Sequence, residues 1–318
     1  MSVIVPAYGV APYIAGTLDS VFAQTFTDYE VIVVNDGSSD SEGLEQVLAP
    51  YRERIRYLAQ ENRGLAGARN TGIGVARGRF FAFLDADDQW EPEYLTFQVA
   101  TMQADPTLDV HYTDAVIFGS SAYTGRSVME FNPSHREVTF QRLITRECVV
   151  VVCAALVRRE AVFGAGLFDP SLRRCEDVDL WLRIAQRGGR VAWKPRRLAR
   201  YRVRGDSLSA DALRMVETYL QVLAKTKRIA ALTPSDHEVL DRQITFEHAT
   251  LDLLKGKEAL LTGEAPKAMR YLQRANTRFH RLRITLTLLL LRLAPRLFVN
   301  LYRRWQPGSS AKKGTSAN

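Results

Sequence analysis

The first part of the chain alternates short apolar runs with segments of helical periodicity. Apolar runs that predict strands occupy residues 2–5, 29–34, 55–58 and 80–84. Segments that predict helices occupy residues 14–24, 41–50, 64–77 and 92–104. Parallel strands joined by helices produce this order, and such strands are nearly continuously apolar because both of their faces are covered. The pattern predicts an α/β fold with a mostly parallel sheet sandwiched by helices.

A second group of elements follows the first. Extended segments are predicted at residues 110–118, 153–157, 190–193 and 199–203, with a helix at 178–187. After about residue 209 the pattern is helical only, in segments at 210–232, 235–255, 256–263 and 265–278. The last two resemble one tetratricopeptide-like hairpin, and a single unit is weak evidence for a repeat array. We expect one α/β domain over residues 1–209 and an all-helical extension over 210–280.

The last apolar stretch, residues 284–301, does not predict a membrane span, because charges interrupt it and a charge at the centre of a span is costly. Basic residues follow one side of the segment, namely Arg281, Arg292, Arg296 and Arg303, and leucines follow the opposite side, namely Leu286, Leu290, Leu293 and Leu297. We expect residues 281–306 to form a basic amphipathic helix on an anionic membrane surface. The alternative is a helix that packs on the protein's own core with a solvated arginine face. Residues 307–318 are expected to be disordered.

Charge is distributed unevenly along the 318 residues. The net charge is +8, whereas the segment from Glu264 to the end carries +11, so the remainder stands at −3. This asymmetry indicates an anionic partner for the tail, either a membrane or a nucleic acid. The tail has no interleaved exposed aromatic residues of the kind that bind nucleic acid, so a membrane is favoured and no nucleic-acid partner is expected.

Cysteine usage and the start of the chain bear on location. Cys148, Cys153 and Cys175 have no paired spacing, which indicates reduced thiols, and no grouping of His and Cys has the spacing of zinc ligands. The first residues form a strand pattern without the charged and apolar regions of a signal peptide. We therefore expect a cytoplasmic protein, peripheral at the inner face of the membrane.

The run at residues 80–84 ends abruptly in three carboxylates, Asp85, Asp87 and Asp88. Such charges repel one another unless a cation or hydrogen bonds offset them. Hard divalent cations commonly bridge a carboxylate to a substrate phosphate. The cluster therefore predicts a metal–diphosphate site. Alternatively, Asp88 caps the next helix, but a cap requires only one of the three.

Four motifs follow strand ends in order. They are Val5-Pro6-Ala7-Tyr8, Asn35-Asp36-Gly37, the loop from Asn62 to Gly72, and Asp85-Ala86-Asp87-Asp88. In this combination residues 2–209 resemble a family 2 glycosyltransferase with the GT-A, Rossmann-like fold. Each motif alone is weak, and the combination is specific.

The donor-side roles combine residue chemistry with this resemblance. Asp36 is an acceptor suited to the imide N–H of uracil, or alternatively an Asx-turn residue, and Tyr8 with Pro6 offers a surface for the base. Arg69 is expected to contact the diphosphate or hold the acidic cluster, with a structural ion pair as the alternative. The resemblance implies that Asp85 serves the ribose, Asp87 a divalent metal (Mn²⁺ or Mg²⁺) and Asp88 the donor sugar.

The acceptor side is carried by Cys175-Glu176-Asp177, which resembles the Glu-Asp motif of the family. Asp177 aligns with the catalytic base, and Glu176 is assigned to the donor sugar or acceptor. Inverting transfer needs a base for the acceptor hydroxyl while a metal carries charge on the leaving diphosphate. The alternative is that both carboxylates only stabilise a helix N-terminus.

Three departures from the family pattern stand out. Gly9 replaces a frequent Asn. Arg204 occupies the place of a frequent metal-binding His, and arginine has no lone pair to donate, so either the metal keeps more waters or Arg204 meets the diphosphate. The Gln-x-x-Arg-Trp element of processive synthases is absent, which predicts single additions.

The sequence thus predicts an inverting, non-processive glycosyltransferase that uses a nucleotide sugar, expected to be a UDP-sugar. The acceptor is expected to be a lipid-linked or surface glycan, as in polysaccharide biosynthesis. One alternative is a catalytically silent nucleotide-sugar-binding or scaffold protein. Another is nucleotidyl transfer, which the absence of Lys and Arg from residues 7–14 disfavours.

Overall fold

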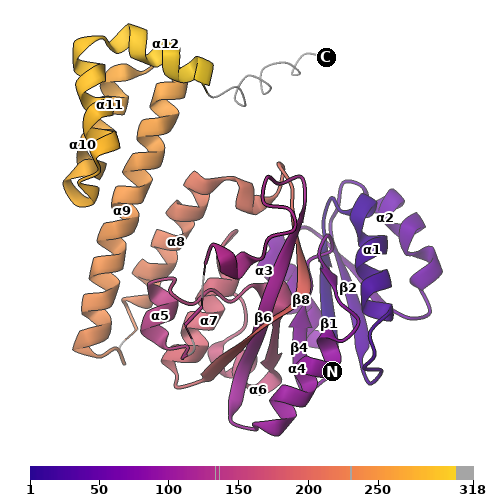
Figure 1. Ribbon diagram of the computed structural model, residues 1–318. Coiled ribbons are helices and arrows are strands. Elements are labelled where there is room, and N and C mark those ends of the chain that lie inside the picture. Colours follow the sequence, from indigo (N-terminus) through magenta and orange to yellow (C-terminus); the bar gives the residue numbers. More distant parts are fainter. Residues whose placement is uncertain (133, 136, 230, 306–318) are drawn as a thin grey trace. The chain divides into compact units, whose positions relative to one another are not determined.

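The computed structural model describes residues 1–132, 134–135, 137–229 and 231–305 (Figure 1). The chain divides into two compact units. The first comprises residues 1–210 with 225–239, and the second comprises residues 211–224 with the chain from 240 onward. The tail at 307–318, for which disorder is predicted, and residue 306 lie outside the described residues.

The described part of the first unit is built on an eight-stranded sheet with the order β3-β2-β1-β4-β7-β6-β8-β5. The strands are β1 Ser2–Ala7, β2 Glu30–Asp36, β3 Arg56–Gln60, β4 Phe80–Phe83, β5 Gln89–Trp90, β6 Leu108–Gly119, β7 Ala155–Arg158 and β8 Arg190–Val203. Strands β3, β2, β1 and β4 are parallel. Strand β7 is antiparallel to both of its neighbours, β6 and β8 are parallel, and β5 is antiparallel to β8. The α/β prediction is confirmed, with a mixed sheet.

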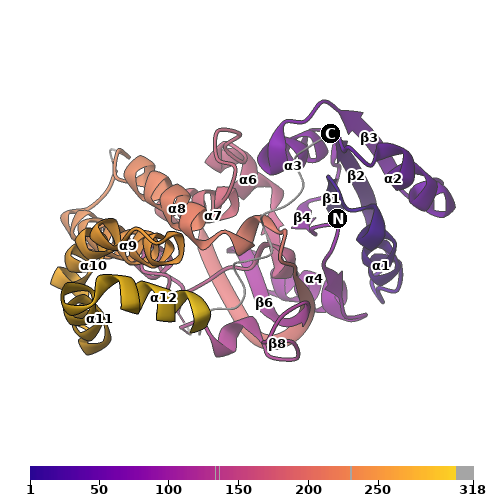
Figure 2. The same cartoon turned by 90° about the horizontal axis from the view of Figure 1, so that it is seen from above.

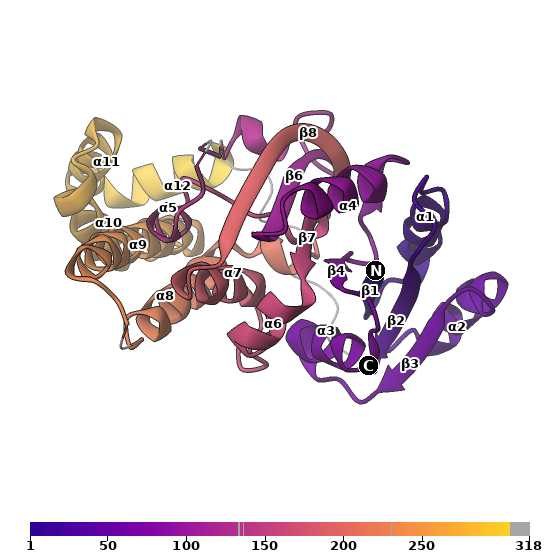
Figure 3. The ribbon, with the colours of Figure 1, turned by 90° about the horizontal axis from the view of Figure 1, so that it is seen from below.

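Helices cover both faces of this sheet. They are α1 Ala11–Phe22, α2 Ser41–Leu48, α3 Gly64–Val75, α4 Tyr94–Ala104, α5 Phe140–Ile144, α6 Arg159–Ala165 and α7 Glu176–Gln186. Figures 2 and 3 show α1 and α2 on one face of β1 and β2, with α3 on the other. Successive strand residues point to opposite faces. Val3 therefore joins the core under α1, while Ile4 meets Gly72 of α3.

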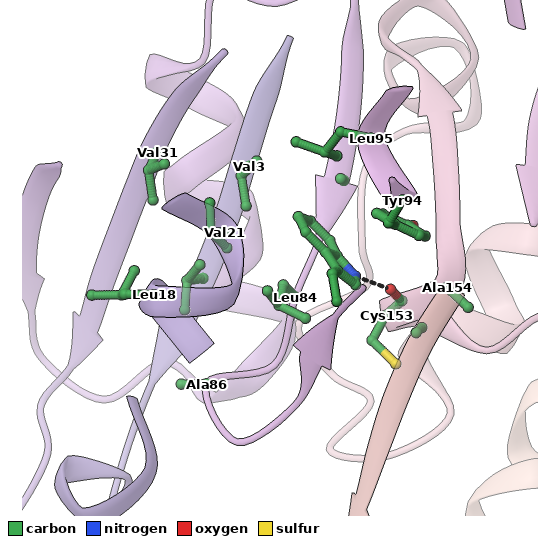
Figure 4. Packing of buried hydrophobic residues seen from close by; sticks show 14 of the residues in the cluster. Val3, Leu18, Val21, Val31, Leu84, Ala86, Tyr94, Leu95, Cys153 and Ala154 are labelled. Carbon is green, nitrogen blue, oxygen red and sulfur yellow. Dashed lines mark hydrogen bonds between the residues drawn. The ribbon is translucent and has the colours of Figure 1, made fainter. Parts of the chain in front are cut away.

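The core under α1 is made of aliphatic side chains from both layers. Val3 and Val31 project from β1 and β2 toward Leu18 and Val21 of α1 (Figure 4). Burying one such side chain contributes about 1.5–3 kcal/mol. The Trp90 ring, in the same core, donates from Nε1 to the carbonyl of Cys153 at 2.6 Å. This contact ties β5 to the segment that leads into β7.

Several elements differ from the sequence prediction. The two strands predicted at 190–193 and 199–203 are one strand, β8, because a long parallel register with β6 supports it throughout. Asp88 does not cap a helix: β5 follows it, and α4 begins at Tyr94 after Glu93. Strand β5 has only two residues and was not predicted. It is a strand because it pairs with β8, and a two-residue segment has no periodicity of its own.

The second unit is helical. Its elements are drawn from α8 Ala212–Thr226, α9 Pro234–Thr262, α10 Ala265–Phe279, α11 Leu282–Leu293 and α12 Pro295–Trp305. Segments predicted at 235–255 and 256–263 form one helix, α9, in which Gly256 lies under the Leu272 side chain. The single helix predicted over 281–306 is instead two, because the helix stops at Ala294 before Pro295. Within the described residues, none of the helices is both long and apolar enough to cross a bilayer.

Helix α3 lies close to the sheet because small residues form its inner side. A Cβ added at Gly72 would lie 2.5 Å from Cγ2 of Ile4 in β1, whereas a Cβ at Gly74 would meet nothing within 4 Å. Both glycines lie inside the helix, where glycine is intrinsically unfavourable. The close approach therefore places Arg69 and Asn70, on the same helix, near the carboxyl ends of the strands.

We expect Gly72→Ala to lower the free energy of unfolding by about 1–3 kcal/mol, because the new methyl group overpacks Ile4. Gly74→Ala is the matched control and should raise it by about 0.5–1 kcal/mol through helix propensity. Urea denaturation of the three proteins measures both changes. Effects of the same sign at the two positions would contradict the close approach of α3 to β1.

Candidate active site

The predicted site residues gather at the carboxyl ends of neighbouring parallel strands. Tyr8 follows β1, Asp36 is the last residue of β2, and the acidic loop 85–88 follows β4. Strand β1 pairs directly with both β2 and β4, so the three loops leave the same edge. This edge of an open α/β sheet is the usual place for ligand binding.

The Asp36 side chain is held by the neighbouring strand and loop. Its Oδ1 accepts hydrogen bonds from Gln60 Nε2 at 2.6 Å and from the Arg63 amide at 2.8 Å. Gly37 follows with a φ of +65°, and a Cβ there would lie 2.7 Å from the Asn62 amide nitrogen. Asp36 therefore has a fixed orientation supplied by β3, in place of the Asx-turn considered from the sequence.

The two base-contact candidates differ in exposure. The Tyr8 ring is 54% exposed, whereas Pro6 is buried inside β1. Tyr8 alone of the two offers a free surface to an aromatic ligand. The Gly9 amide donates to Ser38 Oγ at 2.6 Å, which joins the loop after β1 to the loop after β2.

Backbone contacts hold the acidic loop at the end of β4. The Asp88 amide donates to the Asp85 carbonyl at 2.9 Å, which closes a turn. Asp88 is buried, its Oδ1 accepts from the Arg202 amide at 2.7 Å, and its Oδ2 has no hydrogen-bond partner in the described structure. Arg202 Nε in turn donates to the Asp87 carbonyl at 2.8 Å. The end of β8, which is not a neighbour of β4 in the sheet, thus fixes the loop that follows β4.

Arg69 connects the acidic loop to helix α7. Its guanidinium is 1% exposed and donates from Nη2 to Asp85 Oδ1 at 2.6 Å and from Nη1 to Glu176 Oε1 at 2.5 Å. It also lies 5.3 Å from the centre of the Phe168 ring. Being buried and doubly paired, Arg69 is placed to hold the carboxylates, one of the roles expected from the sequence, and a contact with the diphosphate stays a prediction.

Asn70 reinforces the same connection. Its side-chain amide donates to the Phe168 carbonyl at 2.8 Å and accepts from the Phe168 amide at 3.0 Å. Two consecutive residues of α3 therefore fasten the segment that precedes α7. Sequence analysis identified Arg69 and not Asn70, because a single Asn in a helix has no pattern that distinguishes it.

Helix α7 begins with the acidic pair of the predicted motif. Cys175 adopts the left-handed conformation, with a φ of +54°, immediately before Glu176. Residues other than glycine rarely adopt this conformation, which costs about 1–3 kcal/mol. Glu176 is buried against Arg69, whereas Asp177 is only partly buried and accepts from the Val178 amide at 2.8 Å. As a residue, Asp177 is therefore the more exposed of the two.

Negative charge exceeds positive charge around the acidic loop. Burial and the neighbouring Asp85 raise the pKa of Asp87 to about 6, and burial raises the pKa of Asp88 well above its ordinary value. Burial likewise raises the pKa of Glu176 to about 7, and raises that of Asp177, although Arg69 opposes both changes. Burial alone lowers the pKa of Arg69, but Asp85 and Glu176 outweigh it and raise the pKa. A bound cation would relieve the remaining repulsion.

Arg204 lies over this acidic loop. Its Nε is 3.0 Å from Asp87 Oδ2 and 3.6 Å from Asp206 Oδ1. Its guanidinium lies 4.7 Å from the centre of the Tyr13 ring, and that of Arg202 lies 5.0 Å from the same ring. Residues two apart in extended backbone share a side, so the Arg-Val-Arg spacing at the end of β8 was the available sequence signal for Arg202.

The residues present fit a divalent cation only in part. Mg²⁺ usually binds through one or two carboxylates, with substrate phosphates and water completing its shell. Asp87 supplies such a carboxylate, next to a surplus of negative charge. No group of three or more His, Cys, Asp or Glu side chains within the described residues forms a metal site. A cation here would depend on the ligand's own oxygens.

Comparison with known proteins agrees with this geometry. The model of the family "Glycosyl transferase family 2" matches residues 2–163, about half of the chain. An uncharacterized glycosyltransferase of Rickettsia felis is 30% identical over 191 residues, which cover 58% of this chain and 31% of that protein. The matched part thus spans about a third of the length of that relative.

Solved structures share the fold. S. aureus TarS 1–349 in complex with UDP-GlcNAc has a TM-score of 0.65 at 19% identity, covering 95% of this chain and 90% of that one. The mannosyltransferase PcManGT from Pyrobaculum calidifontis in complex with GDP-Man and Mn²⁺ has a TM-score of 0.63 at 21% identity, covering 96% and 87%. The GT-A type of fold predicted from the sequence is confirmed. With its family model matched over half its length, the chain belongs to glycosyl transferase family 2.

Proposed function

We propose that this protein is an inverting, non-processive glycosyltransferase that moves a sugar from a nucleotide sugar to a hydroxyl group. The observation that carries the proposal is the Arg69 bridge. It brings the donor-side Asp85 and the acceptor-side Glu176, which are far apart in sequence, onto one guanidinium. The bridge thereby ties the loop that carries Asp87, assigned to the leaving group, to the start of α7, which carries Asp177, assigned to the incoming alcohol.

A UDP-sugar is the proposed donor. The Asp36 carboxylate, oriented by Gln60 and the Arg63 amide, is suited to accept the imide N–H of uracil, and the exposed Tyr8 ring to stack on the base. Asp85 is assigned to the ribose. The fold shared with a TarS structure that contains UDP-GlcNAc supports this class of donor.

Asp177 is the proposed general base. Its carboxylate takes the proton of the acceptor hydroxyl while the hydroxyl oxygen forms a bond to the anomeric carbon. The bond from that carbon to the nucleoside diphosphate breaks, and its electron pair leaves with the diphosphate. A single displacement of this kind inverts the anomeric configuration. Cys175, in the left-handed conformation, immediately precedes the first turn of α7, which carries Asp177.

Two positively charged groups are proposed to stabilise the negative charge of the leaving diphosphate. Arg204 lies beside Asp87 with a partly exposed guanidinium, which suits it for charge-assisted hydrogen bonds to phosphate oxygens. A divalent cation, Mn²⁺ or Mg²⁺, held by Asp87 would add Lewis-acid stabilisation of the same charge. PcManGT, which shares the fold, was solved with Mn²⁺.

The sugar-contact assignments remain proposals. Asp88 is assigned to the donor sugar through its place in the acidic loop, next to Asp87. Glu176 is assigned to the same region through its place next to Asp177. The acceptor is proposed to be a lipid-linked or surface glycan, with the enzyme peripheral at the inner face of the membrane. The missing Gln-x-x-Arg-Trp element supports single additions.

We expect Asp177→Asn to lower the turnover of sugar transfer by about 10²–10⁴-fold, since the amide cannot accept the proton. Binding of UDP, followed by calorimetry, should change little. Asp28→Asn, at an exposed aspartate outside the site, is the matched control. If wild type and Asp177→Asn bind UDP-sugars equally and neither turns over any of them in the presence of acceptor extracts, the silent-scaffold alternative replaces this proposal.

We expect the rate of transfer to fall as the pH is lowered through the raised pKa of Asp177, because the base acts only when deprotonated. The acidic limb of the profile of kcat/KM should therefore lie above pH 3.9, the ordinary aspartate value. Steady-state rates between pH 4 and 8, with folding checked by circular dichroism, measure it. A rate that stays flat down to pH 4 would contradict the assignment.

We expect Arg204→Met to weaken binding of UDP by roughly tenfold, the loss of a charge-assisted hydrogen bond. Arg204→His should restore binding only when Mn²⁺ is present, because imidazole is a metal ligand. Calorimetry with Mn²⁺ and with EDTA measures each variant. If Arg204→Met binds UDP as tightly as wild type in EDTA, Arg204 does not contact the diphosphate.

A further inference from the structure

Helices α11 and α12 carry a set of leucines that the described residues leave exposed. Each of these side chains is between 46% and 74% exposed. We name this set the leucine face. It consists of Leu282, Leu286, Leu289, Leu290, Leu293, Leu297 and Leu301. Isolated exposed leucines are ordinary, whereas several on one face of a helix, as the spacing of the five on α11 places them, mark an interaction surface.

Helix α11 is apolar on two opposite sides. Ile284, Leu288 and Leu291 form its inner side and pack with Leu272 of α10 and Val299 of α12. The spacing of 3.6 residues per turn places the leucine face of α11 about half a turn away from these residues. The inner side already satisfies the packing of α11 on α10 (Figure 1). The outer leucines are therefore surplus to the core of this unit.

Arginines flank the leucine face. Six of them are exposed, namely Arg281, Arg283, Arg292, Arg296, Arg303 and Arg304. The sequence has no Asp or Glu after Glu264. None of the six forms an ion pair with a carboxylate in the part of the chain that the structure describes. The surface therefore combines an apolar stripe with uncompensated positive charge.

We propose that α11 and α12 dock on an anionic phospholipid bilayer, with the leucine face in the acyl boundary and the flanking arginines at the headgroup phosphates. An amphipathic helix with apolar side chains on one face and basic residues beside them binds a membrane interface in this way. Basic residues near an anionic leaflet add attraction within a Debye length of the surface. This inference rests on the membrane location in the proposed function and names the surface responsible for it; it does not depend on the proposed donor or base.

Charge decides between a bilayer and a second copy of the chain as the apolar partner of this surface. Two copies that met through the leucine face would bring two sets of six arginines together without a carboxylate between them. Like charges at an interface oppose association. An anionic bilayer supplies an apolar layer to cover the leucines and phosphates to pair with the arginines.

Co-sedimentation of the full chain with vesicles tests the proposal. Vesicles of phosphatidylcholine alone are compared with vesicles that contain phosphatidylglycerol, in low salt and in 1 M NaCl. We expect sedimentation with the phosphatidylglycerol vesicles and at least tenfold weaker association with phosphatidylcholine alone. High salt should weaken the association, because the Debye length falls to about 3 Å at 1 M ionic strength.

Two double variants separate the contribution of the leucines to vesicle association from that of the arginines. Leu286→Gln with Leu290→Gln removes exposed apolar surface, and Arg292→Glu with Arg296→Glu reverses exposed charge, so both should fold like wild type by circular dichroism. Each should weaken vesicle association by roughly tenfold or more. Arg187→Glu, an exposed arginine of the first unit, is the matched charge control and should associate like wild type. UDP binding by calorimetry should be unchanged in all of them.

Three results would overturn the proposal. The first is a wild-type protein that stays in the supernatant with phosphatidylglycerol vesicles. The second is association that both double variants retain in full. The third is a wild-type oligomer in sedimentation velocity that the leucine substitutions dissociate while no vesicle binding occurs, which would identify a second copy as the partner. None of these results bears on sugar transfer, which is measured separately.

Discussion

A guanidinium buried between two carboxylates is the interaction on which the candidate active site depends. Arg69 can be ionised in the interior only because Asp85 and Glu176 pair with it, and each of those carboxylates is buried or half-buried against it. Removing one member of such a buried set leaves an uncompensated charge and typically costs about 3–5 kcal/mol. The acidic loop after β4 and the start of α7 are therefore fixed together through one residue of α3.

The rest of the site is arranged around this bridge. Small residues on α3 allow the helix to approach β1, which brings Arg69 within reach of the strand ends. The end of β8 then fixes the acidic loop through the amide and Nε of Arg202, and places Arg204 against Asp87. The result is a site with more negative than positive charge, in which the pKa of Asp87 and of Asp88 is raised by burial and by neighbouring carboxylates. Such a site favours ligands that arrive with cations, as nucleoside diphosphates do.

The chain separates its charges between its two compact units. Carboxylates are concentrated at the strand ends of the first unit, whereas arginines accumulate on α11 and α12, after the last acidic residue. The two proposed ligands, a nucleotide sugar and an anionic membrane, would thus be bound by different chemistry: paired side chains at the strand ends for the first, and a basic surface with leucines for the second. A soluble acceptor would give the leucine face no role, which is why a lipid-linked acceptor is the more consistent of the proposals.

The sequence by itself determined the α/β class, the motifs at the ends of the strands and the basic character of the C-terminal helices. These features follow from local periodicity and composition, which each segment carries alone. Only the tertiary structure decided which groups meet. The contacts of Arg69 with Glu176 and of Arg202 with Asp88 join residues 107 and 114 positions apart, and sheet order rather than local pattern brings them together. Likewise, only the packing of α11 and α12 on α10 decided which leucines are covered, because a sequence apolar on both sides of a helix does not state which side faces the core.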